Sequence, residues 1–268
     1  MLAFLQQFFP EVGTATWIAR MHRGEVVDAD GLRIMPEHAY RAGAQVYYYR
    51  EVVGETPVPF EEFILFQDEH LLVVDKPHFL PVIPSGRYLH ETLLVRLKRK
   101  LKLEHLTPIH RLDRETAGVM LFSHNPASRG YYQSLFHKRE MHKVYEALAA
   151  PLTGCELPLI YRSRMVTGEP FFMQEVQGEP NSETYIEMLE NRGEVALYRL
   201  CPVTGKKHQL RVHLAALGIP IVNDNFYPEL LAEKGDDFSQ PLQLLARSIA
   251  FKDPYTGRER YFESRRIL

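Results

Sequence analysis

Seven short apolar segments, rich in β-branched and aromatic residues, constrain the fold of this 268-residue chain more than any other feature. Segments of this length and composition, bounded by turn residues, predict β-strands. They lie at residues 63–66, 71–75, 118–123, 144–149, 183–189, 194–200 and 244–251. Helical stretches separate them without the strict alternation of an α/β protein. We therefore expect an α+β fold in which helices and loops flank a mixed, mainly antiparallel central sheet.

Two segments have the pattern of amphipathic helices. Asn125 followed by Pro126 is typical of a helix start, because asparagine caps the first amides and proline suits the first helical position. The apolar side of this helix is predicted to be Tyr131, Tyr132, Leu135 and Phe136. The second helix has a buried stripe at i, i+3, i+4 and i+7, formed by Leu210, His213, Leu214 and Leu217. Gly218 is predicted to end it.

The distribution of charge is more informative than the net charge of −2, which by itself argues weakly against a nucleic-acid partner. One basic cluster lies on a predicted helix with leucines on its other side and consists of Arg96, Lys98, Arg99, Lys100 and Lys102. A second cluster consists of His137, Lys138, Arg139, His142 and Lys143. Each cluster suits a polyanion, although a solvated helix face is the alternative.

The segment at residues 54–59 contains Gly54, Pro57 and Pro59 and is typical of a linker. We therefore predict a small N-terminal region at residues 1–57 and a main domain at residues 58–268. The small region is expected to hold a short helix followed by strands. The two cysteines, Cys155 and Cys201, give no disulfide framework and no zinc motif, and no segment is typical of a leader or a membrane span. We expect a cytoplasmic protein.

One loop places a carboxylate between two arginines, in the run from His110 to Gly118. Asp113 lies between Arg111 and Arg114, and neighbouring cations favour the charged form of a carboxylate. An ionised aspartate can act as a nucleophile or stabilise a developing positive charge. A surface ion pair is the alternative for this loop considered alone.

A second segment, residues 204–214, reads as a tight turn that opens a helix rich in cations and amide donors. Arg211 lies off the apolar stripe of that helix. Together with Lys206, Lys207 and His208, it can therefore face a polyanion or a carboxylate.

These two segments, with Lys143-Val144-Tyr145, resemble the RluA-type family of pseudouridine synthases, which convert uridine to pseudouridine within RNA. The resemblance includes the strand and turn at residues 73–77 and the segments at 244–247 and 251–254, and it covers roughly residues 60 to 265 in family order. The chain departs from the family pattern at Ala117, at Lys206 and at Ile221-Val222-Asn223-Asp224, which replaces the usual Gly-Asp pair. None of these changes removes a reactive group.

The resemblance implies a pseudouridine synthase fold with a small appendage at the N-terminus. Here two alternatives are open for that region: a degenerate RNA-binding appendage or a plain lead-in to the main sheet. It assigns catalysis to Asp113, which attacks the sugar or removes a sugar proton. Tyr145 would stack on a flipped uracil, and Arg211 would hold Asp113 charged and oriented. The reaction needs neither a metal nor a nucleotide cofactor.

The expected partner is ribosomal or transfer RNA, with no membrane and no obligate protein partner. Arg111 resembles the family arginine that contacts RNA beside the extracted nucleotide. The other residues expected to bind RNA are His110, Lys143, Lys206, Lys207, His208, Gln209, Arg96, Arg99 and Lys100. Loops at residues 162–177 and 225–240 are expected to select the target uridine.

Two other functions fit parts of the sequence. An RNA-binding protein on the same scaffold could have lost catalysis, although Asp113, Tyr145 and Arg211 are all present. A metal-dependent hydrolase could use His110, Asp113, His208 and His213 as ligands. However, His208 and His213 are five residues apart, about 140° around a helix, whereas the i, i+4 spacing of zinc helices puts both ligands on one face.

Overall fold

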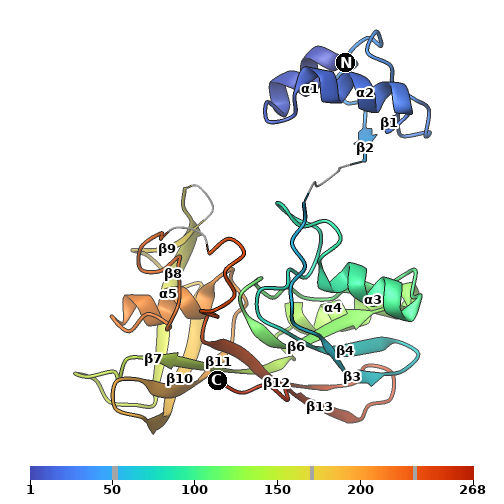
Figure 1. The fold of residues 1–268 in the computed structure, drawn as a ribbon. Helices are drawn as coiled ribbons and strands as arrows, with labels where there is room; N and C mark the ends of the chain where they lie inside the picture. Colours follow the sequence, from blue (N-terminus) through green and yellow to red (C-terminus); the bar gives the residue numbers. More distant parts are fainter. Residues whose placement is uncertain (50–53, 170–171, 232–233) are drawn as a thin grey trace. The chain divides into compact units, whose positions relative to one another are not determined.

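The computed structural model describes residues 1–49, 54–169, 172–231 and 234–268. The chain forms two compact units, Met1–Val53 and Gly54–Leu268 (Figure 1). We placed the division at residues 57 and 58 from the sequence. Two residues in each loop expected to select the target, 170–171 and 232–233, lie outside the described ones. No helix in the described ranges is long and apolar enough to cross a membrane.

The N-terminal unit contains two helices and a two-stranded sheet. Its elements are α1 (Leu2–Phe8), α2 (Thr14–Arg23), β1 (Val26–Asp28) and β2 (Val46–Tyr48), with β1 and β2 antiparallel. Its core consists of Leu5, Trp17, Met21, Val26 and Ile34. We expected a short helix followed by strands, and α1 was not expected, because its N-cap residue, Met1, makes no side-chain cap that could mark a helix start at Leu2.

The larger unit is built on an eleven-stranded sheet. Its strands are β3 (Phe63–Gln67), β4 (Leu71–Lys76), β5 (Thr107–Pro108), β6 (Ala117–Ser123), β7 (His142–Ala149), β8 (Leu159–Thr167), β9 (Met173–Val176), β10 (Ser182–Asn191), β11 (Ala196–Pro202), β12 (Leu244–Lys252) and β13 (Glu259–Glu263). The order is β3-β4-β6-β12-β7-β11-β10-β8-β9, with β13 paired to β12 and β5 to β6. Among the described pairings, β6 with β12 is parallel and the others are antiparallel. The predicted mixed, mainly antiparallel sheet is confirmed.

All seven predicted strands are present, but residues 162–177 are not the loop that we expected. They contain the end of β8 and all of β9, which pair as an antiparallel hairpin. In β8, partly buried and exposed residues alternate, and Met165 is its one buried residue. The two faces of the strand therefore differ little in hydrophobicity, and the sequence lacks the alternation that marks a strand. Arg162 and Arg164 on its exposed side gave the segment the composition of a loop.

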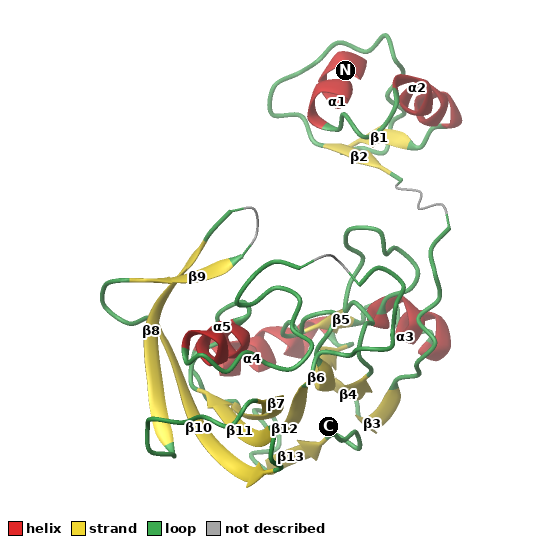
Figure 2. Cartoon of the chain, turned by 60° about the vertical axis from the view of Figure 1, so that its left-hand side comes forward, coloured by secondary structure: helices red, strands yellow, loops and turns green. Residues whose placement is uncertain are grey.

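Figure 2 shows α3 (Leu93–Leu101), α4 (Pro126–His137) and α5 (Gln209–Ala216) lying along the sheet of the larger unit. The core clusters place α3 and α4 on opposite faces of one half of the sheet and α5 on the other half. α3 packs with Leu72, Val74, Met120 and Phe122, whereas α4 packs with Leu71, Val73, Val119 and Leu121. Alternate residues of a strand point to opposite faces, which explains this division. α5 packs on β7, β10 and β11.

The predicted helix ends are confirmed, with one error on α4. The Asn125 side chain accepts a hydrogen bond from the Ala127 amide, and Gly218, with φ of 77°, follows the end of α5. Tyr131 is 59% exposed, so its placement on the apolar side of α4 was wrong. It is adjacent to the buried Tyr132, and neighbouring helical residues point about 100° apart.

Gly118 lies where the two halves of the sheet meet. Its φ is 112°, and a Cβ atom there would lie 2.2 Å from the carbonyl oxygen of Ala246 on β12. A glycine is therefore required by both backbone conformation and space. This close contact fixes the start of β6 and, with it, the loop that carries Asp113.

Candidate active site

Asp113 lies in the loop between β5 and β6, with its side chain 17% exposed. Its Oδ2 atom faces Arg211 Nη1 at 3.5 Å and His208 Nε2 at 3.7 Å. Its Oδ1 atom faces Arg111 Nη2 at 3.7 Å. The loop and the start of α5, which lie about a hundred residues apart in the sequence, therefore meet at this carboxylate.

Arg211 is held by a second carboxylate that the sequence analysis did not assign. Its Nε and Nη2 atoms donate to the two carboxylate oxygens of Asp224, at 2.7 and 2.6 Å. The guanidinium also lies over the ring of Phe226, 4.7 Å from the centroid, and its side chain is 3% exposed. Burial alone would lower the pKa of Arg211, but the hydrogen bonds and charge of Asp224 raise it. Arg211 is thus a permanently charged, fixed group with one nitrogen directed at Asp113.

Sequence reasoning recorded Asp224 as a departure from the family pattern and gave it no partner. Asp224 lies in an irregular segment thirteen positions after Arg211. Neither helical nor strand periodicity could therefore have paired the two residues from the sequence. The residue types offered one signal, because an arginine buried in a helix requires a carboxylate partner.

Tyr145 on β7 and Asp113 line the same pocket, which has a volume of about 140 Å³. Burial raises the pKa of the Tyr145 hydroxyl, and the negative charge of Asp113 adds to this effect. The phenol is therefore neutral and its ring is a flat apolar wall beside the carboxylate. The polar residues that line the pocket with them include Arg111, Lys143, Thr204, Lys206, Lys207, His208, Gln209 and Arg211.

Lys143 precedes Tyr145 by two residues on the same strand and so faces the same side of the sheet. Its ammonium group donates to the carbonyl oxygen of Thr204 at 3.3 Å. Burial lowers the pKa of Lys143 to about 8, so the cation remains the main form at neutral pH. The pocket therefore offers a positive charge on the side that the 204–208 turn forms.

Two residues that we expected to bind RNA also make hydrogen bonds within the protein. Gln209 is buried, and its amide connects Thr204, the Lys206 backbone and β10. The His110 ring accepts a hydrogen bond from the Leu121 amide at Nε2, and its Nδ1 faces the Arg111 carbonyl oxygen. Because these polar groups already have protein partners, both side chains hold backbone in place.

The three α3 residues expected to bind RNA lie away from the Asp113 pocket and are not among the residues that line it. Arg96 donates to the carbonyl oxygens of Val58 and Phe60 and pairs with Glu91. Its guanidinium thereby fastens the segment before β3 to α3, and RNA binding by Arg96 stays a prediction. Arg99 and Lys100 are exposed, beside His90 and Glu62 respectively.

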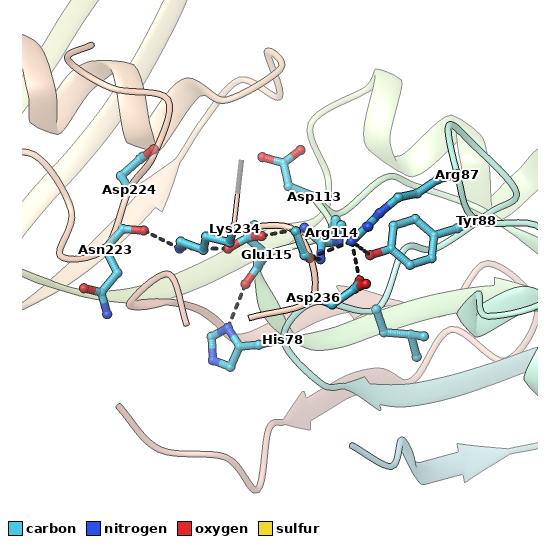
Figure 3. A network of polar contacts seen from close by, with 12 residues as sticks. His78, Arg87, Tyr88, Asp113, Arg114, Glu115, Asn223, Asp224, Lys234 and Asp236 are labelled. Atoms are coloured by element: carbon cyan, nitrogen blue, oxygen red, sulfur yellow. Dashed lines mark hydrogen bonds and ion pairs between the residues drawn. The ribbon is translucent and has the colours of Figure 1, made fainter. Parts of the chain in front are cut away.

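A larger groove of about 580 Å³ continues from Asp113 toward residues 81–88 and 223–235. A network of ion pairs underlies it, and Figure 3 shows the Asp113 carboxylate turned away from that network. Lys234 bonds to Glu115 at 3.0 Å and to the Asn223 carbonyl oxygen at 2.6 Å. Arg114 pairs with Glu115 and donates to the Gly235 carbonyl oxygen. These contacts connect the Asp113 loop to the segment after α5.

Lys76, the last residue of β4, fixes the same loop. Its fully buried ammonium group donates to the carbonyl oxygens of Pro77, Leu80 and Arg114, each at 2.9 Å. Burial lowers the pKa of Lys76 to about 7, although the charges of Asp113 and Glu115 oppose the shift. Since Arg114 follows Asp113 directly, Lys76 holds the backbone that carries the carboxylate.

The four side chains of the metal-site hypothesis do not converge. The His213 ring nitrogens face Ser163, Ser182 and Thr184, in a buried polar cluster with β8 and β10. His110 is used by backbone groups, as described above. Across the described ranges, no three His, Cys, Asp or Glu side chains are grouped to hold a metal ion.

Comparison with known proteins agrees with this geometry. A model of the RNA pseudouridylate synthase family matches residues 70–216. An RNA pseudouridine synthase of Synechocystis sp., described as uncharacterized, is 30% identical over 234 residues, which are 85% of this chain and 79% of that protein. The dual-specificity RNA pseudouridine synthase RluA of Vibrio vulnificus is 35% identical over 209 residues, 71% of this chain and 78% of that protein.

A solved structure, human RNA pseudouridylate synthase domain containing 4, superposes with a TM-score of 0.59 at 29% identity, covering 75% of this chain and 87% of that one. The chain therefore belongs to the RNA pseudouridylate synthase family. Within it, the chain is of the RluA type, an isomerase that converts uridine in RNA to pseudouridine.

Proposed function

We propose that Asp113 is the catalytic carboxylate and that the pocket it shares with Tyr145 receives a uridine flipped out of a structured ribosomal or transfer RNA. The observation that carries the proposal is the shared pocket, in which an aspartate faces a fixed arginine and borders a neutral tyrosine ring. A flipped base needs such a flat face once it leaves its neighbours.

In the reaction, the bond between N1 of uracil and C1′ of ribose breaks and a bond between C5 and C1′ forms. The hydrogen on C5 is released and N1 gains a proton, so the change is an isomerisation without oxidation. Asp113 acts on the sugar, either as the nucleophile at C1′ or as the base that removes a sugar proton. Both roles need an ionised carboxylate, which the Arg211 guanidinium favours.

The other residues divide by position. Tyr145 stacks on the uracil, and Arg211, oriented by Asp224, keeps Asp113 charged. Arg111, at 64% exposure, and Lys143, Lys206 and Lys207 lie at the pocket and supply the positive charge that RNA phosphates require. The name of the Vibrio vulnificus relative, a dual-specificity enzyme, supports more than one RNA as substrate.

The decisive experiment replaces Asp113 with asparagine. The variant should bind RNA as the wild type does but release no tritium from RNA labelled at uracil C5, because the carboxylate acts only in the chemical step. Asp30→Asn, an identical change at an exposed position of the N-terminal unit, should leave tritium release unchanged. Full activity in Asp113→Asn would exclude the proposed role.

The target is found by mapping pseudouridine in total RNA from cells with and without the protein. A position that loses its modification on deletion names the substrate. A complete map with no lost position would instead favour an RNA-binding protein without catalysis.

We also propose that residues 1–57 add contacts to RNA and take no part in the chemistry, and that the protein acts in the cytoplasm. The compact fold of the N-terminal unit supports the first point, and two free cysteines support a reducing compartment. Arg41→Glu, at an exposed position, should weaken RNA binding and leave kcat unchanged. Fluorescence microscopy of a tagged protein tests the location.

A further inference from the structure

His208 is the polar residue of the pocket whose place is least explained by RNA binding. Its side chain is 5% exposed, which leaves little surface for a phosphate. Its backbone is left-handed, with φ of 54°, although its side chain caps no amide of α5. Non-glycine residues held in this conformation are uncommon and are enriched at active sites.

A chain of hydrogen bonds determines which nitrogen of His208 carries a proton. The Met173 amide on β9 donates to the Tyr227 hydroxyl oxygen at 3.0 Å. That hydroxyl lies 2.8 Å from His208 Nδ1. The hydroxyl accepts from Met173 through a lone pair, so its proton is available to be donated to Nδ1. Burial lowers the pKa of His208 to about 4, although Asp113 opposes this, so the ring is neutral at pH 7 and its proton is on Nε2.

The Nε2–H group and Arg211 face the same oxygen of Asp113. Two of the three Arg211 nitrogens bond to Asp224, which leaves Nη1 to face Asp113 Oδ2 at 3.5 Å. His208 Nε2 lies 3.7 Å from the same oxygen. Both separations are beyond ordinary hydrogen-bond length, and such contacts tighten when substrate binds.

We propose that His208 is a positioning residue: its Nε2–H, fixed by Tyr227 and Met173, holds Oδ2 of Asp113 together with Arg211, so that Oδ1 is the oxygen that meets the ribose. This inference rests on the catalytic role proposed for Asp113. It also reassigns His208, which we expected from the sequence to contact RNA. The hairpin of β8 and β9 then contributes to the site, since Met173, whose amide orients the Tyr227 hydroxyl, is the first residue of β9.

Two variants of His208 separate the role of its two nitrogens. His208→Gln places an amide where Nε2 lies and keeps a donor toward Asp113. His208→Asn places its amide near Nδ1 and loses that donor. We expect kcat to fall about 10- to 100-fold in His208→Asn, the effect of one hydrogen bond to a charged group, and much less in His208→Gln, with KM unchanged in both.

The backbone conformation makes this comparison stringent. Asparagine tolerates the left-handed region better than glutamine does, so a purely structural role would favour His208→Asn in both melting temperature and activity. Equal losses of kcat in the two variants, or a larger loss in His208→Gln, would overturn the proposal. Tyr227→Phe should lower kcat less than His208→Asn does. It removes the hydroxyl that holds the histidine proton on Nε2, but it leaves Nε2 itself in place.

A spectroscopic test needs no enzyme activity and so distinguishes failure of this proposal from failure of the catalytic role of Asp113. Ring nitrogen-15 spectra of the full-length protein contain twelve histidines, and the signal missing from His208→Gln identifies His208. We expect a neutral ring protonated at Nε2 at pH 7. A ring protonated at Nδ1, or at both nitrogens, would overturn the proposal.

Discussion

The pair formed by Arg211 and Asp224 supports the sharpest test of how the site is built. Both side chains are almost fully buried, and the pair is bidentate at 2.6 and 2.7 Å. Asp224 also accepts hydrogen bonds from the Phe226 and Tyr227 amides. Asp224→Asn keeps the shape and one oxygen but removes the charge that balances Arg211.

The expected loss is that of a hydrogen-bonded charge at a buried site. A hydrogen bond to a charged group contributes about 1.5–3 kcal/mol, whereas removing one partner of a buried ion pair outright costs about 3–5 kcal/mol. Asp224→Asn should therefore destabilise the larger unit by about 1.5–3 kcal/mol and Asp224→Ala by about 3–5 kcal/mol. Activity should fall in both, since Arg211 is released from its position beside Asp113.

Urea unfolding followed by far-ultraviolet circular dichroism measures these changes. The single tryptophan, Trp17, belongs to the N-terminal unit, so its fluorescence reports on the wrong part of the chain. Glu187→Gln breaks the exposed pair with Arg199 and is the matched control, with an expected change below about 1 kcal/mol. An Asp224→Asn protein as stable and active as this control would refute the reasoning.

Three further predictions concern the loop that carries Asp113. Gly118→Ala should prevent stable folding, because its Cβ would lie 2.2 Å from the Ala246 carbonyl oxygen, and the yield of folded protein measures this. Lys76 has a pKa of about 7 in the folded protein and an ordinary pKa of 10.5, so the unfolded chain binds more protons between these two pH values. The free energy of unfolding should therefore rise from pH 7 to 10.5. Lys76→Met should flatten that rise, which urea titrations across this pH range measure. Lys234→Met and Glu115→Gln should show a coupling of about 0.5–3 kcal/mol in a double-mutant cycle of unfolding, and simple additivity would contradict the ion pair.

The sequence was sufficient to predict the strands and helices that show hydrophobic periodicity and the two segments that carry a specific motif. The central strands β4 and β6 are mostly apolar along their length and were predicted correctly. The helix α5 was also predicted, but the prediction that its burial is confined to one apolar stripe was wrong, because six consecutive residues from Gln209 to Leu214, Arg211 among them, are buried. The loop of Asp113 and the turn before α5 were identified by their residue types, and the structure brings them to one pocket.

The remaining site residues come from segments without any period. Asp224, Tyr227 and Lys234 lie in an irregular stretch whose contacts depend on the folded chain. Arg96 shows that a basic cluster in the sequence does not reveal what each cation contacts. An arginine in such a cluster looks the same in the sequence whether it faces solvent or binds backbone carbonyl oxygens. His208 was noticed as a cation, but its neutral state follows from burial that composition does not reveal.

The parallel pairing of β6 with β12 spans two residue pairs, Ala117 with Leu245 and Gly118 with Ala246. Asp113 is carried on one side of this seam, and Arg211 belongs to α5, which packs on the other side. The 3.5 Å separation between Asp113 Oδ2 and Arg211 Nη1 therefore joins two groups that are carried on opposite sides of the seam. A substitution at the seam is therefore expected to change the separation between Asp113 and Arg211 without contacting a bound substrate.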